Sequence, residues 1–403
     1  MHLDNEHSWE LDVVVVGGCG HVGLPLALAF ADRGLRVCAY DIDRRAVEAV
    51  GAGQMPFREE GAGEVLRRVL SGGSFATTCD ASVIARSEVI VVVVGTPVDE
   101  HLNPDPHVVP AVLEELACHF RPGQLLVLRS TVYPGVTRRV EGLIDERGLE
   151  VDVAFCPERI AEGHAMEELF ALPQIVSARD QRVVGRAAAL FKTLTPSIVE
   201  LEPEEAELAK LFTNTWRYIK FAAANQFFVM ANDHGLDYAR IRAALAHDYP
   251  RAADMPGAGF AAGPCLLKDT MQLAAFTNNT FVLGHAAMLV NEGLPLYLVS
   301  RLEEMCDLRA STVGILGCAF KAESDDTRSS LAYKLKRILG FKARRVLVTD
   351  PYVTSDPNLV CLDDLLDASD VMVIAAPHRV YAELSTTKPV VDIWDLRRRG
   401  SLV

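Results

Sequence analysis

The chain has 403 residues, of which 50% are hydrophobic and 23% are charged, so it has the composition of a globular protein with room for two or three domains. Its net charge of -14 argues against nucleic acid or an anionic membrane as the main partner. The nine cysteines form no CxxC pair and no zinc-ligand spacing, so we expect a reducing, cytoplasmic compartment and no bound metal.

Three stretches resemble targeting or membrane segments in position or length. The first ten residues are acidic and lack an apolar core, which is typical of a frayed tail and not of a signal peptide. The uncharged runs 13–31 and 270–291 are long enough to span a membrane. The first contains four glycines and the second is rich in polar residues, so we expect neither to cross one.

The chain begins with a strand, turn and helix pattern. The β-branched run 13–16 predicts a buried parallel strand, and 24–31 predicts an apolar helix. The turn between them has the GxGxxG signature, and its expected ligand positions are Gly18, Gly20, His21, Val22 and Gly23. The next predicted strand, 36–40, ends at Asp41, where a carboxylate would bind ribose hydroxyls and repel a 2′-phosphate. This context predicts an NAD-binding domain; glycines used only for tight packing are the alternative.

Three further buried strands are predicted at 89–94, 125–128 and 151–155. Ligands lie at the carboxyl ends of strands in doubly wound sheets, so Thr96 and Thr131 are expected beside the nicotinamide nucleotide. Hydroxyls that only cap loops are the alternative. Charged candidates for ligand contact follow the third strand: Glu158, Arg159 and Glu162.

A single long helix is predicted from Pro203 to His234, because proline and acidic residues suit its first turn and Gly235 would end it. Its length of about 48 Å exceeds the need of one domain, so it should bridge domains or form a dimer interface. Lys210 and Asn214 lie four positions apart and share a face, as they would if both reached one bound oxygen. A solvated lysine beside an incidental asparagine is the alternative.

A run of small and turn-forming residues, which begins with Gly259 and Phe260, leads into Cys265. Such a run would let backbone and ligand approach closely. Lys268 and Asp269 follow three and four positions after the cysteine, which is the outline of an activated thiol. A buried apolar cysteine is the alternative.

Residues 311–403 repeat the opening pattern in weaker form, with strands predicted at 312–317 and 345–350 and a third inside 369–375. The repeat implies a second nucleotide-binding fold. Lys321 follows its first strand and Arg328 lies seven residues further, where basic residues suit a phosphate. The predicted fold class is therefore α/β, with two Rossmann-like doubly wound domains joined by a long central helix.

In order and chemistry these motifs resemble the nucleotide-sugar dehydrogenases, the UDP-glucose/GDP-mannose dehydrogenase family, which oxidise the primary alcohol of a nucleotide-linked sugar to a uronic acid. The resemblance covers roughly residues 11 to 395 and rests on GxGxxG, Ser-Thr-Val-x-Pro-Gly, Pro-Glu-Arg-x-x-x-Gly, Lys-x-x-x-Asn, the cysteine loop and Lys321. Pro157-Glu158-Arg159 and the lead into Cys265 look like the branch that acts on UDP-N-acetylmannosamine. Enzymes of the UDP-glucose branch tend to carry Pro-Glu-Phe-Leu and Gly-Gly-Ser-Cys instead. His21 departs from the family, which usually has an aromatic residue there.

The resemblance implies a role for each candidate. Cys265 would be the nucleophile, Lys210 and Asn214 would stabilise oxyanions, and Asp269 would orient water and lysine. Glu158 would help to hydrolyse a thioester. The implied cofactor contacts after the glycine loop are Asp41, Thr96, Thr131, Glu162, Lys268 and Arg328. The implied substrate contacts are Glu158, Arg159, Lys210, Asn214, Gly259, Phe260, Lys321 and, from across a dimer, Arg251.

The resemblance also implies the reaction and the organisation of the chain. We expect four-electron, NAD-dependent oxidation of a UDP-linked 2-acetamido sugar, UDP-N-acetylmannosamine first, through a thioester on Cys265. A dehydrogenase of UDP-glucose or UDP-N-acetylglucosamine is the alternative; a two-electron β-hydroxyacid dehydrogenase and a non-catalytic NAD-binding regulator are further ones. The expected domains are NAD-binding (1–199), helical and dimerising with the cysteine loop (200–305), and nucleotide-sugar-binding (306–403), in a homodimer built on the long helix.

Overall fold

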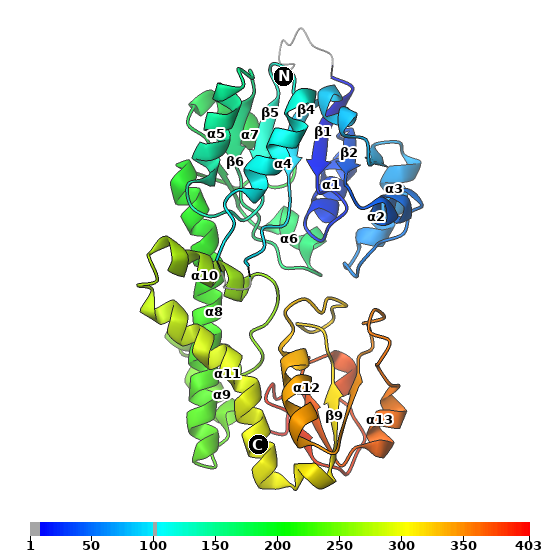
Figure 1. The fold of residues 1–403 in the computed structure, drawn as a ribbon, viewed down its shortest axis with the longest axis vertical. Helices are drawn as coiled ribbons and strands as arrows, with labels where there is room; N and C mark the ends of the chain where they lie inside the picture. The colour runs from blue at the N-terminus through cyan, green and yellow to red at the C-terminus, as the bar shows by residue number, and fades with distance from the viewer. Residues whose placement is uncertain (1–8, 100–102) are drawn as a thin grey trace. The chain divides into compact units, whose positions relative to one another are not determined.

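The computed structural model of the protein describes residues 9–99 and 103–403 (Figure 1). Residues 1–8 of the expected frayed tail lie outside the described residues. The chain divides into two compact units, Met1–Thr213 and Asn214–Val403.

The N-terminal unit is built on an eight-stranded sheet with the order β3-β2-β1-β4-β5-β6-β7-β8. Neighbouring strands are parallel except for β6 and β7. The strands are β1 (Leu11–Val16), β2 (Val37–Tyr40), β3 (Phe75–Thr78), β4 (Ser87–Val92), β5 (Leu125–Leu128), β6 (Asp152–Phe155), β7 (Gln174–Ser177) and β8 (Ile198–Leu201). The strand order reverses between β1 and β4, so the loops after these two strands flank the crevice in which doubly wound sheets bind ligands.

Alternating side chains of the central strands enter two different cores. Val13 and Val15 of β1 pack with α1, α3 and α7, whereas Val14 and Val16 pack with α4 and α5. Because the side-chain period of a strand is two, an unbroken apolar run has to be covered on both faces. The helices of this unit are α1 (Gly23–Asp32), α2 (Arg44–Gly51), α3 (Ala62–Ser71), α4 (Val108–Leu116), α5 (Val136–Glu146), α6 (Ala165–Ala171) and α7 (Gln181–Phe191).

The long central helix α8 runs from Pro203 to Asp233, one residue short of its predicted end. Gly235, with a φ of 67°, follows as the left-handed residue that commonly ends a helix. The boundary between the two units falls inside α8, so the helix is continuous from one into the other.

The C-terminal unit combines helices with a second sheet. Its strands have the order β10-β9-β11-β12 and all pairs are parallel. Helices α12 and α13 both pack against β9 and β10 and flank β9 in Figure 1. The elements are α9 (Tyr238–Ala246), α10 (Leu266–Phe276), α11 (Val282–Met305), β9 (Thr312–Leu316), α12 (Leu331–Lys342), β10 (Arg345–Thr349), α13 (Leu362–Ala368), β11 (Val371–Ile374) and β12 (Val390–Val391). The predicted fold class is confirmed.

Helix α11 is long and apolar enough to cross a membrane by length and composition alone. In the structure its Leu294, Leu298 and Leu302 are buried in the core of the C-terminal unit. The core helix of a globular protein meets the same criteria of length and composition. The uncharged run 270–291 is not one element, because it contains most of α10, a turn and the first part of α11.

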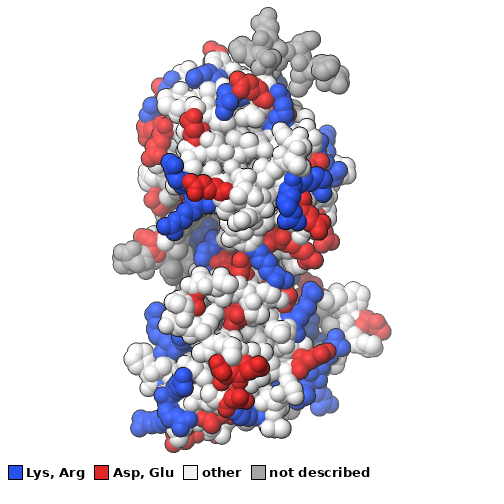
Figure 2. Space-filling model, turned by 90° about the vertical axis from the view of Figure 1, so that its right-hand side faces the viewer, with Lys and Arg blue, Asp and Glu red and all other residues white. Residues whose placement is uncertain are grey.

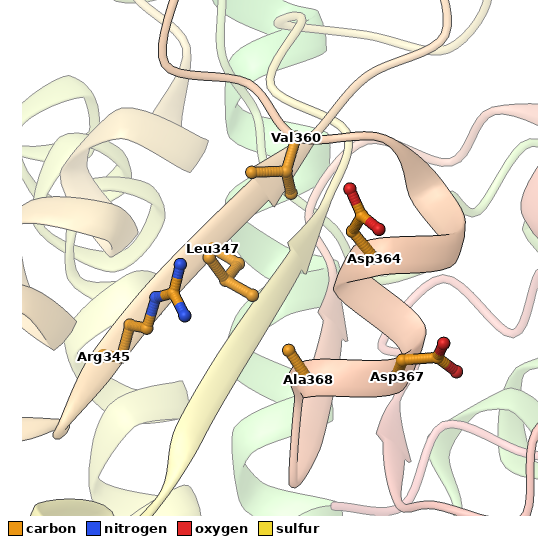
Figure 3. Close-up of a pocket in the computed structure, with 6 residues that line it drawn as sticks. All are labelled: Arg345, Leu347, Val360, Asp364, Asp367 and Ala368. Carbon is orange, nitrogen blue, oxygen red and sulfur yellow. The ribbon is translucent and has the colours of Figure 1, made fainter.

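A pocket of about 500 Å³ lies beside the edge of the C-terminal sheet (Figure 3). Arg345 and Leu347 line it from β10, and Asp364 and Asp367 line it from α13. β10 is the outermost strand of its sheet. The pocket therefore flanks the sheet edge and not the crevice between β9 and β11, where the strand order reverses.

Charged side chains of both signs are interspersed over the face drawn in Figure 2. Exposed pairs such as Arg36 with Asp12 are separated by 2.7 Å. Such pairs contribute only about 0–1 kcal/mol each in water. The two apolar cores of the N-terminal sheet and the core of the C-terminal unit therefore dominate the stability of the fold.

Candidate active site

The turn after β1 forms a cradle in which the glycines have different tasks. Gly17, not part of the predicted signature, has a φ of 76°. A Cβ on Gly18 would lie 2.6 Å from the Val15 carbonyl oxygen, and one on Gly23 would lie 2.1 Å from that of Gly17. A Cβ on Gly20 would meet only the Gly17 oxygen, at 3.6 Å. Three glycines thus serve the turn and its packing, while Gly20 keeps space open beside the loop for a ligand.

Asp41 lies beside this loop at the end of β2. Its carboxylate accepts hydrogen bonds from the backbone amides of Cys19 and Asp43, each at 3.0 Å. His21 stacks on Phe57 with ring centroids 4.2 Å apart, and Val22 is the residue immediately before α1. The structure therefore brings together the glycine loop and the acidic residue that the sequence predicts for ribose binding.

Thr96 and Thr131, which follow β4 and β5, are joined by a hydrogen bond. The Thr96 hydroxyl donates to the Thr131 carbonyl oxygen at 2.6 Å. Glu207 of α8, which is 1% exposed, accepts hydrogen bonds from the amides of Gly135 and Thr137 at 2.6 and 2.8 Å. Glu207 caps α5 in this way and ties the loop after β5 to the helix that carries Lys210 three positions later.

Glu158 is held by a residue that the sequence did not single out, Arg129. Arg129 is 1% exposed, and its Nε donates to Glu158 Oε2 at 2.9 Å while its Nη2 contacts the same oxygen. Glu158 Oε1 accepts from the backbone amides of Arg159 and Ile160 at 2.7 and 3.0 Å. Both carboxylate oxygens of Glu158 are therefore engaged within the protein.

The neighbours of Glu158 in the same loop are anchored separately. The Arg159 guanidinium donates from Nη2 to the carbonyl oxygen of Pro173. Glu162 is half-buried in the turn that ends at Gly163. Glu59, 7% exposed, accepts from the amide of Gly163 at 2.7 Å and so fixes this turn.

Lys210 and Asn214 lie one turn apart on α8 and are both buried, with 8% and 5% exposure. Asn214 donates from Nδ2 to Asp269 Oδ2 at 2.5 Å. Asp269 of α10 is fully buried, and its Oδ1 lies 2.8 Å from the Lys268 ammonium nitrogen. Asn214 of α8 and Lys268 of α10 thus share the buried Asp269 carboxylate as their acceptor.

Cys265 is exposed and is the last residue before α10. Negative charge on its sulfur would face the positive end of that helix. Four other cysteines are buried, and burial raises the pKa of Cys19, Cys156 and Cys318 to about 12 and that of Cys38 to about 11. Their thiols are therefore inert at neutral pH, which separates Cys265 from them.

The glycines before Cys265 admit aromatic rings of the C-terminal unit. A Cβ on Gly259 would lie 2.0 Å from the Trp394 ring, and one on Gly263 would lie 2.6 Å from the Phe320 ring. Phe260 packs edge-on against Trp394, with centroids 6.4 Å apart. The run of small residues is thus required first for packing within the protein.

A buried asparagine holds the same loop from α8. Asn225, with 0% exposure, donates to the Gly259 carbonyl oxygen and accepts from the Gly259 amide, both at 2.9 Å. Asn291 of α11 supports Asn225 through an amide hydrogen bond of 2.9 Å. This pair of asparagines fixes the start of the cysteine loop relative to α8.

The basic candidates of the C-terminal unit lie outside its core. The Lys321 ammonium lies 5.6 Å from the Phe320 ring centroid. Arg328 pairs with Asp326 at 2.5 Å. Arg251 is exposed in a short 3₁₀ turn and contacts the Tyr249 hydroxyl at 3.2 Å. All three side chains are positioned within loops and not within α-helices or strands.

Sequence reasoning missed the residues that hold these candidates in place: Gly17, Glu59, Arg129, Asn225 and Trp394. Arg129 had a usable signal, because an arginine directly after an apolar strand has to find a partner when the strand is buried. Trp394 had none, since 135 positions separate it from Gly259.

Family models match nearly the whole chain. The NAD-binding domain of the UDP-glucose/GDP-mannose dehydrogenase family matches residues 12–195, its central domain matches 204–292, and its UDP-binding domain matches 314–398.

Individual relatives match the chain over similar lengths. A UDP-N-acetyl-D-mannosamine dehydrogenase of Salmonella typhi is 30% identical, with 91% of this chain and 93% of the relative covered. The structure of a UDP-glucose dehydrogenase from Pyrobaculum islandicum superposes with a TM-score of 0.88 at 31% identity, covering 97% of this chain and 96% of the other. The structure of a UDP-D-ManNAc dehydrogenase from Pyrococcus horikoshii gives 0.86 at 28% identity, with 93% and 91% covered.

Proposed function

This chain belongs to the UDP-glucose/GDP-mannose dehydrogenase family, and on that premise we propose that it oxidises the primary alcohol of a UDP-linked 2-acetamido sugar to the uronic acid with NAD as oxidant. The proposed sugar is N-acetylmannosamine, with UDP-glucose and UDP-N-acetylglucosamine as the alternatives. The observation that carries the proposal is the exposed Cys265 at the start of α10, with Asp269 buried in the same helix and bound to Asn214 of α8.

The residues of the N-terminal unit fit NAD. Gly20 leaves open space beside the loop after β1, and the Asp41 carboxylate lies next to that loop. A carboxylate at this position accepts the two ribose hydroxyls and repels a 2′-phosphate, so NAD is favoured over NADP. When bound, NAD accepts the hydride that leaves the substrate carbon, and oxidation of an alcohol to an acid needs two equivalents. Thr96 and Thr131 would line the nicotinamide end, and Glu162, Lys268 and Arg328 are further proposed contacts.

The thiolate of Cys265 is the nucleophile for the aldehyde stage. Its sulfur forms a bond to the aldehyde carbon, loss of hydride from that carbon leaves a thioester, and water cleaves the carbon–sulfur bond to release the carboxylate. The positive end of α10 supports the thiolate, and exposure admits the substrate.

Lys210 and Asn214 donate to the oxyanions that form before and after thioester formation. Their shared helical face and their burial support this role, because donors in a water-poor site act strongly on developing charge. Asp269 orients Asn214 through their hydrogen bond. Its further proposed role is to orient Lys210 and a water. Glu158 acts indirectly: since Arg129 and two amides engage both of its oxygens, it fixes the loop that carries Arg159.

The acetamido preference rests on Arg159 and on the relatives. The ion-pair partner of Glu158 is Arg129, so this carboxylate does not hold the Arg159 guanidinium. The guanidinium donates from Nη2 to Pro173, and its remaining N–H groups suit an acetamido carbonyl or a phosphate. Lys321, Gly259 and Phe260 complete the substrate side, and relatives named UDP-N-acetyl-D-mannosamine dehydrogenases match more than nine-tenths of the chain.

We further propose a homodimer, with domains 1–199, 200–305 and 306–403 for NAD, dimerisation and the nucleotide sugar. Phe212, Trp216, Phe227 and Met230 are large apolar residues exposed on α8, which supports a contact with a second copy. Arg251, exposed in its turn, then completes the partner's site. No disulfide joins the cysteines of the described chain, which supports the cytoplasm as the compartment.

Counting NADH per sugar consumed tests the reaction: two are expected, one would indicate a two-electron dehydrogenase, and none a regulator.

Comparing kcat/KM for UDP-N-acetylmannosamine, UDP-N-acetylglucosamine and UDP-glucose tests the sugar. A tenfold preference for UDP-glucose, about 1.4 kcal/mol, would contradict the acetamido assignment and leave the reaction class intact. Arg159→Ala should lower kcat/KM for the acetamido sugars more than for UDP-glucose.

A further inference from the structure

Each of the two Rossmann-like sheets has an aspartate directly after an equivalent strand, and the two aspartates have different hydrogen-bond partners. Asp41 follows β2 in the N-terminal sheet, and Asp350 follows β10 at the same place in the C-terminal sheet. Asp350 Oδ2 accepts from the amides of Cys318 and Ala319 at 2.7 and 3.0 Å, much as Asp41 accepts from Cys19. Unlike Asp41, Asp350 also meets a histidine side chain, because His378 Nε2 lies 3.1 Å away and both side chains are fully buried.

His378 connects this carboxylate to the loop after β9. Its Nδ1 accepts a hydrogen bond from the Glu323 amide at 2.9 Å, so Nε2 carries the ring proton and donates to Asp350. Burial raises the pKa of Asp350, but the hydrogen bond and the electrostatic interaction with His378, together with the hydrogen bonds from the amides of Tyr352 and Cys318, outweigh burial and lower this pKa to about 2. A neutral imidazole therefore bridges an ionised carboxylate and a backbone amide.

Glu323 is held from three sides. Its φ of 55° is uncommon for a residue with a side chain. Its carboxylate accepts from the Tyr352 hydroxyl and from the Arg379 amide, both at 2.8 Å, and its own amide binds His378. The loop that Glu323 belongs to begins at Phe320, whose amide donates to the Asp326 carbonyl oxygen at 2.9 Å, and contains Lys321. Glu323 thus pins the middle of the loop that carries the proposed nucleotide contact.

We propose that His378 is a positioning residue for the UDP half of the substrate. By accepting the Glu323 amide it holds the 320–328 loop, and with it Lys321, in the conformation that binds the nucleotide. By donating to Asp350 it anchors this loop to the end of β10. The inference rests on the proposed UDP-sugar function and deepens it; His378 itself does not touch the substrate.

Two substitutions separate the two bonds of His378. In His378→Asn the amide oxygen occupies the place of Nδ1 and still accepts from Glu323, but the side chain is too short to reach Asp350. In His378→Gln the amide nitrogen reaches toward Asp350, but no acceptor remains at the position of Nδ1. The full-length variants are compared with the wild type for the Kd of UDP by calorimetry, for the KM of the UDP-sugar and of NAD, and for kcat.

His378→Gln is expected to raise the Kd of UDP and the KM of the sugar about tenfold, the equivalent of about 1.4 kcal/mol, while kcat and the KM of NAD stay within twofold. His378→Asn is expected to remain within about threefold of the wild type. Equal effects of the two variants, or a loss confined to kcat, overturn the proposal. A purely structural role would change NAD and UDP binding together, and this outcome overturns it as well.

Tyr352→Phe provides a second test if the histidine variants do not fold. It removes one hydroxyl from Glu323 and leaves His378 and Asp350 in place. It is expected to raise the Kd of UDP about threefold with an unchanged KM for NAD. If the wild type binds UDP and Tyr352→Phe binds it equally well, the positioning role fails alone. If the wild type does not bind UDP, the proposed substrate class fails, and the positioning role fails with it.

Discussion

Cys265 and Cys361 are both exposed, and each is the last residue before a helix. The two thiols differ in whether the sulfur caps the helix that follows. Cys361 Sγ accepts the Asp364 amide at 3.4 Å and acts as a helix cap. Cys265 has no capping hydrogen bond from its side chain. Cys361 therefore serves its helix as a cap, a use of the sulfur that Cys265 does not share.

Cys265→Ser is expected to abolish acid formation, because a serine hydroxyl is far less ionised than a thiol at neutral pH and forms no thioester. NADH per UDP-sugar should fall from two to at most one, measured by absorbance with the acid quantified by chromatography. Cys361→Ser, the matched control, should still give two. Two NADH per sugar from Cys265→Ser would rule out the thioester route.

Lys210→Ala is expected to lower kcat about 100-fold with a KM within a few-fold of the wild type, because a donor to an alkoxide acts mainly in the transition state. Steady-state kinetics with saturating NAD measure both constants. Lys220→Ala on the same helix is the control, since Lys220 pairs with Asp254 on the surface at 3.0 Å. A change confined to KM would show that Lys210 only binds ground-state substrate.

Arg129→Met is expected to destabilise the protein by about 3–5 kcal/mol, because it leaves the Glu158 carboxylate buried without its ion-pair partner. Urea unfolding measures the loss. The double variant with Glu158→Gln should recover part of it, since the buried charge is gone. Arg36→Met, which breaks an exposed pair with Asp12, should cost no more than about 1 kcal/mol. Equal losses for the two arginines would contradict this account of Arg129.

At the scale of elements, α8 presents two opposite faces. At about 100° per residue, the exposed Phe212, Trp216, Phe227 and Met230 fall within about 60° of arc. At the same rotation of about 100° per residue, Lys210 and Asn214, which are both buried, lie on the opposite side of the helix. A second copy could therefore cover the apolar face without covering the polar pair.

Trp216→Glu is expected to convert the proposed dimer to a folded monomer, because a charge in the middle of the apolar face opposes its burial. Sedimentation velocity measures the mass and circular dichroism the fold. If Arg251 completes the partner's site, activity should fall with the dimer. Phe341→Glu is the control, since Phe341 is 88% exposed but lies on α12, outside the proposed helical domain. A monomeric wild type with full activity would contradict both points.

How far the sequence predicts the fold depends on how local the determining contacts are. The strands 125–128 and 312–317 and the helix 203–234 were predicted to within one residue of an end because their signals lie within the segment. The predicted strand 89–94 ends at Val92 instead, because the Val94 amide binds the Ser130 hydroxyl and leaves the ladder. The short, partly polar strands β3 and β8 carry no periodic signal and were missed.

For the candidate site, the sequence yields the candidate residues but not the residues that hold them in place. Asn214 and Asp269, 55 positions apart, were each expected from local patterns, and the structure brings them to 2.5 Å. The partner of Glu158 is 29 positions away, and only the pairing of β5 with β6 brings Arg129 and Glu158 together. His378, fully buried between two loops, had no motif at all.

At the scale of the whole molecule, each unit contains a carboxylate whose pKa is held at about 2. Hydrogen bonds from Arg179 are the main cause that lowers the pKa of Glu204 in the N-terminal unit. For Asp350 in the C-terminal unit, burial raises the pKa, but the interactions with His378 and with the amides of Tyr352 and Cys318 together outweigh burial. The Glu204 side chain is 34% exposed, so water and salt screen its ion pair, whereas Asp350 is fully buried. Protonation of Asp350 should therefore destabilise the folded protein more than protonation of Glu204.

A carboxyl whose pKa is lower in the folded than in the unfolded protein stabilises the fold at pH values above the unfolded pKa of about 3.9, and this stabilisation disappears as the pH falls through the folded pKa. Asp350→Asn is thus expected to destabilise the C-terminal sheet by about 2–3 kcal/mol at pH 7, and the difference from the wild type should shrink between about pH 4 and pH 2. Hydrogen exchange of amides in β9 and β11 measures this locally. Glu204→Gln is the control. It should change the free energy of opening of amides in its own unit by less than about 1 kcal/mol, because its ion pair is partly exposed. If the stability difference between Asp350→Asn and the wild type stays constant down to pH 2, then the shape of the side chain and not its charge accounts for the effect.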